Sequence, residues 1–139
     1  MSSPAANNPL TAATPVPIID GLAPIADQYD AFILDLWGVL HDGVRAYDHA
    51  VETLKQLKAT GKPVCLLSNV PRREAATISK LDGLGLTADL YDHLVTSGEA
   101  THNALKNPPD AWHDKLGGIA YALSPREESE ELTVGTRKA

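Results

Sequence analysis

The chain has 139 residues, a formal net charge of −6 and a single cysteine, Cys65. This length is enough for one domain with a core, and the acidic balance argues against nonspecific nucleic-acid binding. One cysteine excludes an internal disulfide and a cysteine-built metal cluster, and no apolar run approaches the roughly 20 residues of a membrane span. The N-terminus lacks the layout of a secretory signal, so we expect a cytoplasmic protein.

Composition divides the chain into three parts. Residues 1–17 are rich in Ser, Ala, Asn, Thr and Pro without apolar periodicity, which predicts a flexible leader. Residues 18–123 carry the alternating apolar and amphipathic segments expected of a folded core. Residues 124–139 contain four glutamates and almost no apolar side chains, which predicts an acidic, disordered tail.

The stretch Phe32–Gly43, FILDLWGVLHDG, is the most informative in the chain. Its apolar opening predicts a strand buried on both faces and ended by Asp35. Gly38 permits a sharp turn, and Asp42-Gly43 is a tight-turn signal. Open α/β sheets place ligands at the carboxyl ends of their strands, so Asp35 is a candidate functional carboxylate. The alternative is a residue that merely caps the turn, and this stretch alone does not decide between them.

Strands and helices alternate in the residues that follow. A strand, a helix and a strand at this spacing form a βαβ unit with a parallel pair, and we expect a three-layer, Rossmann-like α/β fold with helices on both faces of the sheet. The expected elements are a short helix within 18–29, strands over 31–35, 63–68, 92–96 and weakly 119–123, and helices over 48–61, from Pro71 to about 83, over 97–105 and at 112–115. Asp48 is the expected cap of the second helix, and Ala75, Ile78 and Leu81 are expected to face the core from the third.

Two strands end in polar residues at the same edge of the predicted sheet. Asp35 could be a carboxylate nucleophile or a ligand for Mg²⁺, which prefers hard oxygen ligands. Ser68 and Asn69 end the next strand, and Ser68 with backbone N–H groups at the Pro71 helix could hold a phosphate oxygen. The competing interpretation of Ser68-Asn69 is a helix N-cap without a ligand.

Other candidates carry less information. The five histidines show no metal-ligand spacing, and we expect most of them at the surface. Arg72-Arg73 is interpreted as a solvated helix start rather than an anion site. Trp37 and Trp112 are assigned to core or cap packing, and Cys65 to the core.

Three blocks, LDLWGVLHDG, LLSNVPRR and VTSGEAT, together resemble the haloacid dehalogenase-like (HAD) hydrolase superfamily. They are most similar to class IIA, the branch of pyridoxal-phosphate-phosphatase-like and nucleotidase-like enzymes. The resemblance implies that Asp35 is the nucleophile and that the Trp37 backbone carbonyl and Asp35 bind Mg²⁺. It further implies that Ser68, with Asn69 beside it, binds the transferring phosphoryl group of a phosphorylated small molecule, and that Gly38–Gly43 is a flap.

Two features depart from the family pattern. Trp37 occupies the position of a second aspartate, the general acid of the family's phosphatases, and such acid–base help is typically worth about 10²–10⁴-fold. The family's later lysine and acidic metal-binding pair, expected after a cap domain, have no counterpart here. We therefore expect a truncated form that resembles the N-terminal half of the family.

The leading hypothesis is a HAD-type phosphohydrolase with an aspartate nucleophile and Mg²⁺, having little activity alone. The alternative is a non-catalytic phosphate- or partner-binding α/β module. A phospho-receiver domain is disfavoured, because the strand before Asp35 offers no acidic cluster. No nucleic-acid or membrane partner is expected, and the sequence leaves the substrate and the oligomeric state open.

Overall fold

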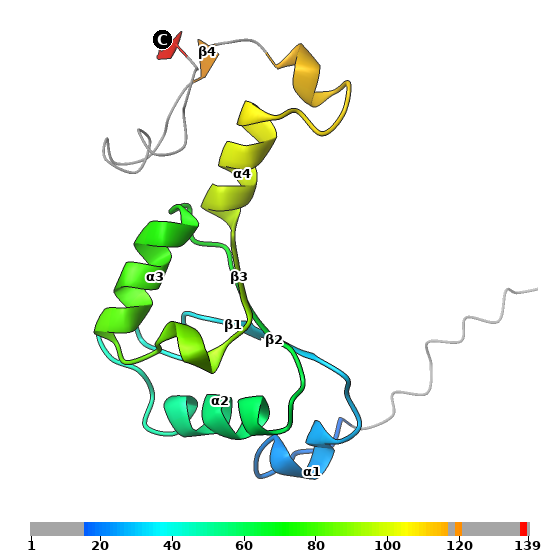
Figure 1. Ribbon diagram of the computed structural model, residues 1–139, viewed down its shortest axis with the longest axis vertical. Helices are drawn as coiled ribbons and strands as arrows, with labels where there is room; N and C mark the ends of the chain where they lie inside the picture. The colour runs from blue at the N-terminus through cyan, green and yellow to red at the C-terminus, as the bar shows by residue number, and fades with distance from the viewer. Residues whose placement is uncertain (1–15, 117–118, 121–136, 139) are drawn as a thin grey trace, which may run out of the picture.

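The computed structural model describes residues 16–116, 119–120 and 137–138. Three parallel strands form its main sheet in the order β1-β2-β3, which is also their order in the chain (Figure 1). Two helical crossovers connect them. The parallel α/β fold expected from the sequence is thus confirmed. The elements are β1 (Phe32–Asp35), α2 (Ala50–Ala59), β2 (Val64–Ser68), α3 (Glu74–Gly83), the 3₁₀ turn η2 (Ala88–Leu90) and β3 (His93–Thr96).

Helix α2 forms because its apolar residues recur on one face. Ala50, Leu54 and Leu57 are buried, and the helix ends before Gly61, which adopts φ +74°. The prediction that Asp48 caps this helix is wrong. The N-cap residue is His49, one position later, and its side chain makes no capping hydrogen bond. Packing of the apolar face, rather than capping, therefore accounts for this helix.

Helix α3 begins at Glu74, so the prediction that Pro71 starts it is wrong. The cause lies in β3 and the helix after it. The carbonyl of Val70 accepts the Gly98 N–H (3.1 Å), and the carbonyl of Arg72 accepts the Thr96 hydroxyl (2.8 Å). Because these contacts occupy the carbonyls, the segment between β2 and α3 is held as a loop.

The inward face of α3 also differs from expectation. Leu81 is buried and Ile78 is partly buried, as predicted, but Ala75 is exposed and Thr77 is buried. The Thr77 hydroxyl donates to the carbonyl of Arg73 (3.1 Å), which satisfies a polar group that would otherwise be costly inside.

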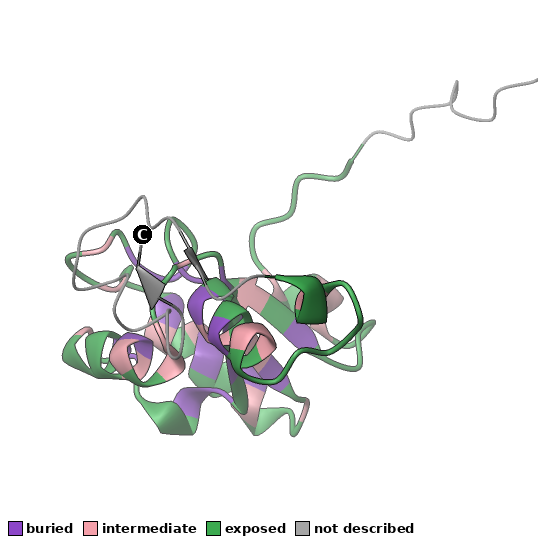
Figure 2. Cartoon of the chain, turned by 90° about the horizontal axis from the view of Figure 1, so that it is seen from above, coloured by how far each residue is buried: buried purple, intermediate pink, exposed green. Residues whose placement is uncertain are grey.

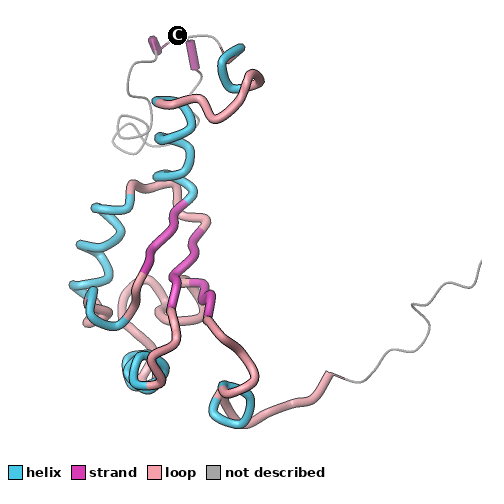
Figure 3. The backbone as a smooth tube through the Cα atoms, turned by 45° about the vertical axis from the view of Figure 1, so that its right-hand side comes forward, coloured by secondary structure: helices cyan, strands magenta, loops and turns pink. Residues whose placement is uncertain are grey.

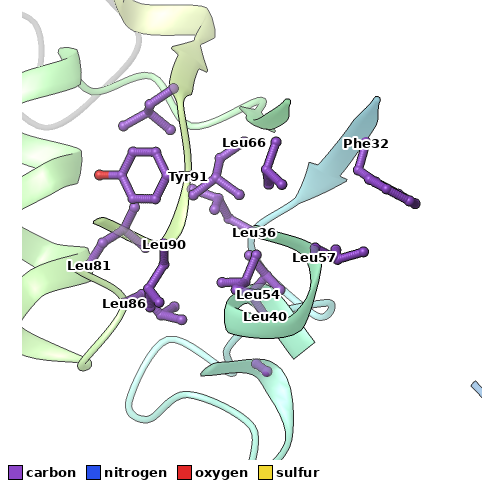
Figure 4. Close-up of a cluster of buried hydrophobic side chains, with 13 residues drawn as sticks. Phe32, Leu36, Leu40, Leu54, Leu57, Leu66, Leu81, Leu86, Leu90 and Tyr91 are labelled. Carbon is purple, nitrogen blue, oxygen red and sulfur yellow. The ribbon is translucent and has the colours of Figure 1, made fainter. Parts of the chain in front are cut away.

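The hydrophobic core lies between the sheet and the helices α2 and α3, which cover the same face (Figures 1 and 3). The close-up in Figure 4 shows Leu66 of β2, Leu54 of α2, Leu81 of α3 and Leu90 of η2 converging on it. Buried residues gather in this interior in Figure 2. Within the described residues, the Tyr91 hydroxyl is the one buried side-chain polar atom without a hydrogen-bond partner, and burial raises the pKa of Tyr91.

The opposite face of the sheet is largely uncovered by the described residues. Ile33 of β1 is 70 % exposed, Leu67 of β2 is 48 % exposed and Val95 of β3 is 43 % exposed. Cys65 shares this face and is only half-buried. The expectation of strands buried on both faces, with helices in a third layer, is therefore not met in the described part of the chain.

The remaining elements lie outside the main sheet. The expected fourth strand does not join it: β4 (Ile119–Ala120) pairs in parallel with β5 (Arg137–Lys138) in a separate two-stranded sheet. Predictions for the leader over 1–15 and for the tail over 124–136 and 139 lie outside the described residues. No described helix has the length and apolarity needed to cross a membrane. These elements are α1 (Ala23–Ala26), α4 (Ser97–Lys106), the 3₁₀ turn η3 (His113–Lys115), β4 (Ile119–Ala120) and β5 (Arg137–Lys138).

Candidate active site

Asp35 is the last residue of β1 and its side chain is exposed. Its Oδ1 accepts a hydrogen bond from the backbone N–H of Leu36 (2.8 Å), and no other hydrogen bond to this carboxylate is made by the described residues. One oxygen is thus held by the backbone while the second, Oδ2, stays available. This arrangement suits a carboxylate that receives a ligand at the carboxyl end of the sheet.

Ser68 ends the neighbouring strand one residue beyond Leu67, the register partner of Asp35. Its side chain is buried, and its Oγ accepts the backbone N–H of Val70 (3.3 Å). Because α3 begins only at Glu74, Ser68 and Asn69 do not cap a helix, and this competing interpretation is wrong. The structure places Asp35 and Ser68 at the same sheet edge, on adjacent strands.

The segment that contains the expected flap, Gly38–Gly43, lies beside the Ser68 loop, and we refer to it as the flap. The Gly38 N–H donates to the carbonyl of His41 (2.8 Å), and Gly38 adopts φ +86°, which a side chain would disfavour. Asp42 Oδ1 accepts the backbone N–H groups of Val44 and Arg45 (both 2.8 Å), and these bonds lower the pKa of Asp42. The tight turn predicted at Asp42-Gly43 is thus confirmed.

His41 is buried, at 8 % exposure, and His102 on α4 is buried as well, so these two are exceptions to the expectation that most histidines lie at the surface. The Nδ1 of His41 accepts the backbone N–H of Gly43 (2.9 Å). Burial, followed by the nearby Lys80 ammonium, lowers the pKa of His41, while Asp42 and Asp35 act in the opposite direction. The ring is therefore a fixed part of the flap.

The loop between β2 and α3 is fixed by the start of α4. The Thr96 hydroxyl, fully buried, donates to the Arg72 carbonyl and accepts the Glu99 N–H (3.0 Å). Gly98 packs so closely that an added Cβ would lie 2.4 Å from the carbonyl oxygens of Pro71 and Arg72. A side chain there would displace the loop that follows Ser68.

Arg73 and Glu99 complete this attachment. The guanidinium donates through Nε (2.6 Å) and Nη2 (3.0 Å) to the two carboxylate oxygens, and the Glu74 N–H donates to the same carboxylate (3.1 Å). The Arg73 hydrogen bonds, with that of the Glu74 N–H, lower the pKa of Glu99 to about 2. Arg73 is thus paired rather than solvated, contrary to expectation.

A cavity of about 380 Å³ lies between the flap, the Ser68 loop and α3. Its wall includes Trp37 and His41 of the flap, Ser68 and Arg72 of the loop, and Lys80 of α3. Both charged side chains that line it are cationic, and Asp35 is not part of the wall. In a chain with a net charge of −6, this makes the cavity locally suited to an anion.

The residues at the end of β1 offer oxygen ligands suited to Mg²⁺. Asp35 presents a free carboxylate oxygen, and the Trp37 carbonyl accepts no backbone hydrogen bond from the described residues. Mg²⁺ in proteins is commonly bound through one or two carboxylates, with water and phosphate oxygens completing its shell. The described residues contain no group of three acidic, histidine or cysteine side chains able to hold a metal.

Several residues of the site escaped sequence-based prediction. Thr96 and Glu99 lie in the VTSGEAT block, but their role follows from contacts 24 to 26 residues away in sequence, which no local pattern encodes. The proximity of exposed Lys80 to buried His41 has no sequence motif either. Trp37 and Trp112, assigned to packing, are 71 % and 64 % exposed.

Comparison with known proteins agrees with this geometry. The 4-nitrophenylphosphatase of Schizosaccharomyces pombe is 28 % identical over 88 residues, which covers 60 % of this chain and 30 % of that protein. A crystal structure of a haloacid dehalogenase-like family hydrolase from Brucella suis 1330 superposes with a TM-score of 0.71 at 25 % identity, over 86 % of this chain and 42 % of that one. A hypothetical protein from Pyrococcus horikoshii OT3 shares the fold, with a TM-score of 0.52 at 24 % identity, over 79 % and 41 % of the two chains.

The chain thus spans less than half the length of these relatives. The sequence model described as haloacid dehalogenase-like hydrolase matches residues 32–133, well over half of the chain. The match includes β1 with Asp35, the Ser68 loop and the start of α4, which are the segments that build the site. The chain belongs to the haloacid dehalogenase-like hydrolase family.

Proposed function

We propose that the chain carries the nucleophile half of a phosphohydrolase site that acts on a phosphorylated small molecule. The observation that supports this most directly is the parallel register of β1 and β2, which sets Asp35 and Ser68 at the same edge on adjacent strands. The 4-nitrophenylphosphatase relative points to the same reaction class. Fold alone would leave the reaction open.

In the proposed reaction, Oδ2 of Asp35 attacks the phosphorus of the ester. The P–O bond to the alcohol breaks, and the alcohol oxygen leaves with the bonding electron pair. Water then attacks the aspartyl phosphate, releases phosphate and restores the carboxylate. The Leu36 N–H, bonded to Oδ1, orients the carboxylate, while the Ser68 hydroxyl and the loop N–H groups bind phosphoryl oxygens. Mg²⁺ bound by Asp35 and the Trp37 carbonyl would offset the negative charge of the phosphoryl group.

Trp37 cannot donate a proton to the leaving oxygen at neutral pH. We therefore expect the reaction to favour esters whose alcohols are acidic enough to leave unprotonated, such as 4-nitrophenyl phosphate over an alkyl phosphate. We also expect slow turnover, because the described residues supply few of the charges that stabilise such a transition state. The Mg²⁺ requirement and the cytoplasmic location stay predictions.

The test is hydrolysis of 4-nitrophenyl phosphate, with and without Mg²⁺, by the chain and by two variants. Asp35→Asn is expected to abolish turnover, whereas Asp114→Asn, an exposed acid of η3, is expected to leave it unchanged. Equal rates for the chain and Asp35→Asn would refute the nucleophile assignment.

The second candidate is a phosphate-binding module without turnover. It is favoured by the absence, within the described residues, of a group of three acidic, histidine or cysteine side chains able to hold a metal. Saturable phosphate binding that depends on Ser68, together with no hydrolysis above the Asp35→Asn background, would establish it in place of the enzyme.

A further inference from the structure

The cavity beside Ser68 contains a histidine whose hydrogen-bonding role is fixed by the backbone. Gly43 donates its N–H to Nδ1 of His41, so Nδ1 carries a lone pair and no proton. In the neutral ring the proton must then reside on Nε2, which makes His41 a donor and not an acceptor at that atom. No described residue accepts a hydrogen bond from Nε2.

This donor belongs to the cavity wall. The His41 side chain is more than nine-tenths buried, yet Nε2 is not among the sealed, unpartnered polar atoms of the described residues. His41 lines the cavity together with Ser68 and Lys80. Since Nδ1 is occupied by the Gly43 N–H, Nε2 is the ring nitrogen left to meet a ligand in this cavity.

Charge makes an anion the matching ligand. The Lys80 ammonium is close enough to lower the pKa of His41, and Lys80 and Arg72 are the charged residues of the wall. Asp42 and Asp35 lie near enough to raise the pKa of His41 but are not part of the wall, so an oxyanion is the ligand that an N–H donor and a cation lining the same cavity would share.

We propose that His41 is a phosphate-binding residue, which donates its Nε2–H to an oxygen of the phosphoryl group held by Ser68, with Lys80 as the neighbouring cation. The inference rests on the proposed function and adds two residues to it. The Gly43 N–H fixes the tautomer of His41, because Gly43 adopts φ +92° and its N–H donates to Nδ1 of the ring. His41 thereby contributes a neutral donor whose orientation is set before the ligand arrives.

A matched pair of variants separates the two ring nitrogens. His41→Asn places an amide oxygen near the position of Nδ1, so it keeps the acceptor for Gly43 and removes the cavity donor. His41→Gln places an amide N–H near the position of Nε2 and keeps the donor. Lys80→Met removes the cation, and Lys106→Met, an exposed lysine of α4 outside the cavity wall, is its control.

The measurement is the dissociation constant for inorganic phosphate by NMR titration of the whole chain, with the ¹⁵N shift of His41 Nε2 as the local signal. Hydrogen bonds to charged groups are worth about 1.5–3 kcal/mol, so His41→Asn should weaken binding by about tenfold or more. His41→Gln should retain most of the affinity, Lys80→Met should weaken binding several-fold, and Lys106→Met should have no effect. Thermal melts verify that each variant is folded.

The outcomes distinguish this inference from the proposed function. Phosphate binding that Ser68→Ala weakens and His41→Asn does not would overturn the role of His41 and leave the proposed function standing. Equal losses in His41→Asn and His41→Gln would show that the ring acts through the flap and would also overturn it. Absence of saturable phosphate binding would count against both.

Discussion

The guanidinium of Arg73 and the carboxylate of Glu99 form a two-point ion pair that joins the loop after Ser68 to the first turn of α4. The two side chains are 30 % and 21 % exposed, so solvent screens this pair less than it screens ordinary surface pairs. The pair, with Thr96 and Gly98, connects three elements: β2, through its loop, α3 and α4. Glu99 thus helps to fix the position of a loop that lies about 26 residues before it in the sequence.

Neutralising Glu99 should destabilise the fold at neutral pH. Glu99→Gln keeps the shape but removes the charge that Arg73 and the Glu74 N–H bind, and charged hydrogen bonds are worth about 1.5–3 kcal/mol. We expect a loss of about 1–3 kcal/mol in the free energy of unfolding by urea denaturation. The control is Glu52→Gln, because Glu52 is exposed and, among the residues that the structure describes, its side chain bonds only to Gln56 on its own helix. Equal effects of the two substitutions would contradict the prediction.

The same carboxylate should give the fold a dependence on acid pH. Its pKa is about 2 in the folded chain against an ordinary 4.5, so the stabilisation is complete above pH 4.5 and is lost as the pH falls toward 2. A difference of this size corresponds to at most about 3.5 kcal/mol. Other carboxylates titrate in the same range, so the readout is the difference in stability between the chain and Glu99→Gln. This difference should shrink from pH 5 to pH 2, and a constant difference would refute the assignment.

Gly98→Ala should be among the most damaging single-methyl additions in the chain. The new Cβ would lie 2.4 Å from two backbone oxygens, so the loop or α4 must shift. Overpacking of this kind costs about 1–3 kcal/mol. The matched control is Gly83→Ala at the end of α3, where an added Cβ meets nothing within 4 Å and φ is ordinary. Thermal melts should show a lower midpoint for Gly98→Ala and an unchanged or higher one for Gly83→Ala.

Truncation of two adjacent leucines of β2 should destabilise the fold to very different degrees, because they face opposite sides of the sheet. Leu66 is fully buried, so Leu66→Ala should lower the free energy of unfolding by about 2–5 kcal/mol. Leu67 is 48 % exposed, so Leu67→Ala should lower it by less than about 1 kcal/mol. Urea denaturation of both variants gives the comparison. Similar losses would mean that Leu67 is covered in solution by something outside the described residues.

The sequence predicted the strands well because their apolar runs and bounding turns are local signals. Asp35, Ser68 and the Asp42-Gly43 turn were placed correctly for the same reason. The start of α3 was misplaced because distant residues, Thr96 and Gly98, occupy the carbonyls that would otherwise begin the helix at Pro71. The exposure of one sheet face was not predicted either, because an apolar run indicates a strand but not whether helices cover one or both faces of the sheet. The burial of His41 could not be predicted because it depends on contacts between the flap and elements distant in sequence, such as α3, which lines the same cavity.

Each strand of the main sheet pairs with the strand made just before it, so the sheet can assemble in the direction of translation. β2 meets β1 already synthesised, and β3 then meets β2. The Ser68 loop cannot be completed in this order. Its carbonyls accept hydrogen bonds from Thr96 and Gly98, and Arg73 pairs with Glu99, all of which are synthesised later. On the ribosome, the Ser68 loop therefore takes its final form only after the first turn of α4 has emerged from the exit tunnel.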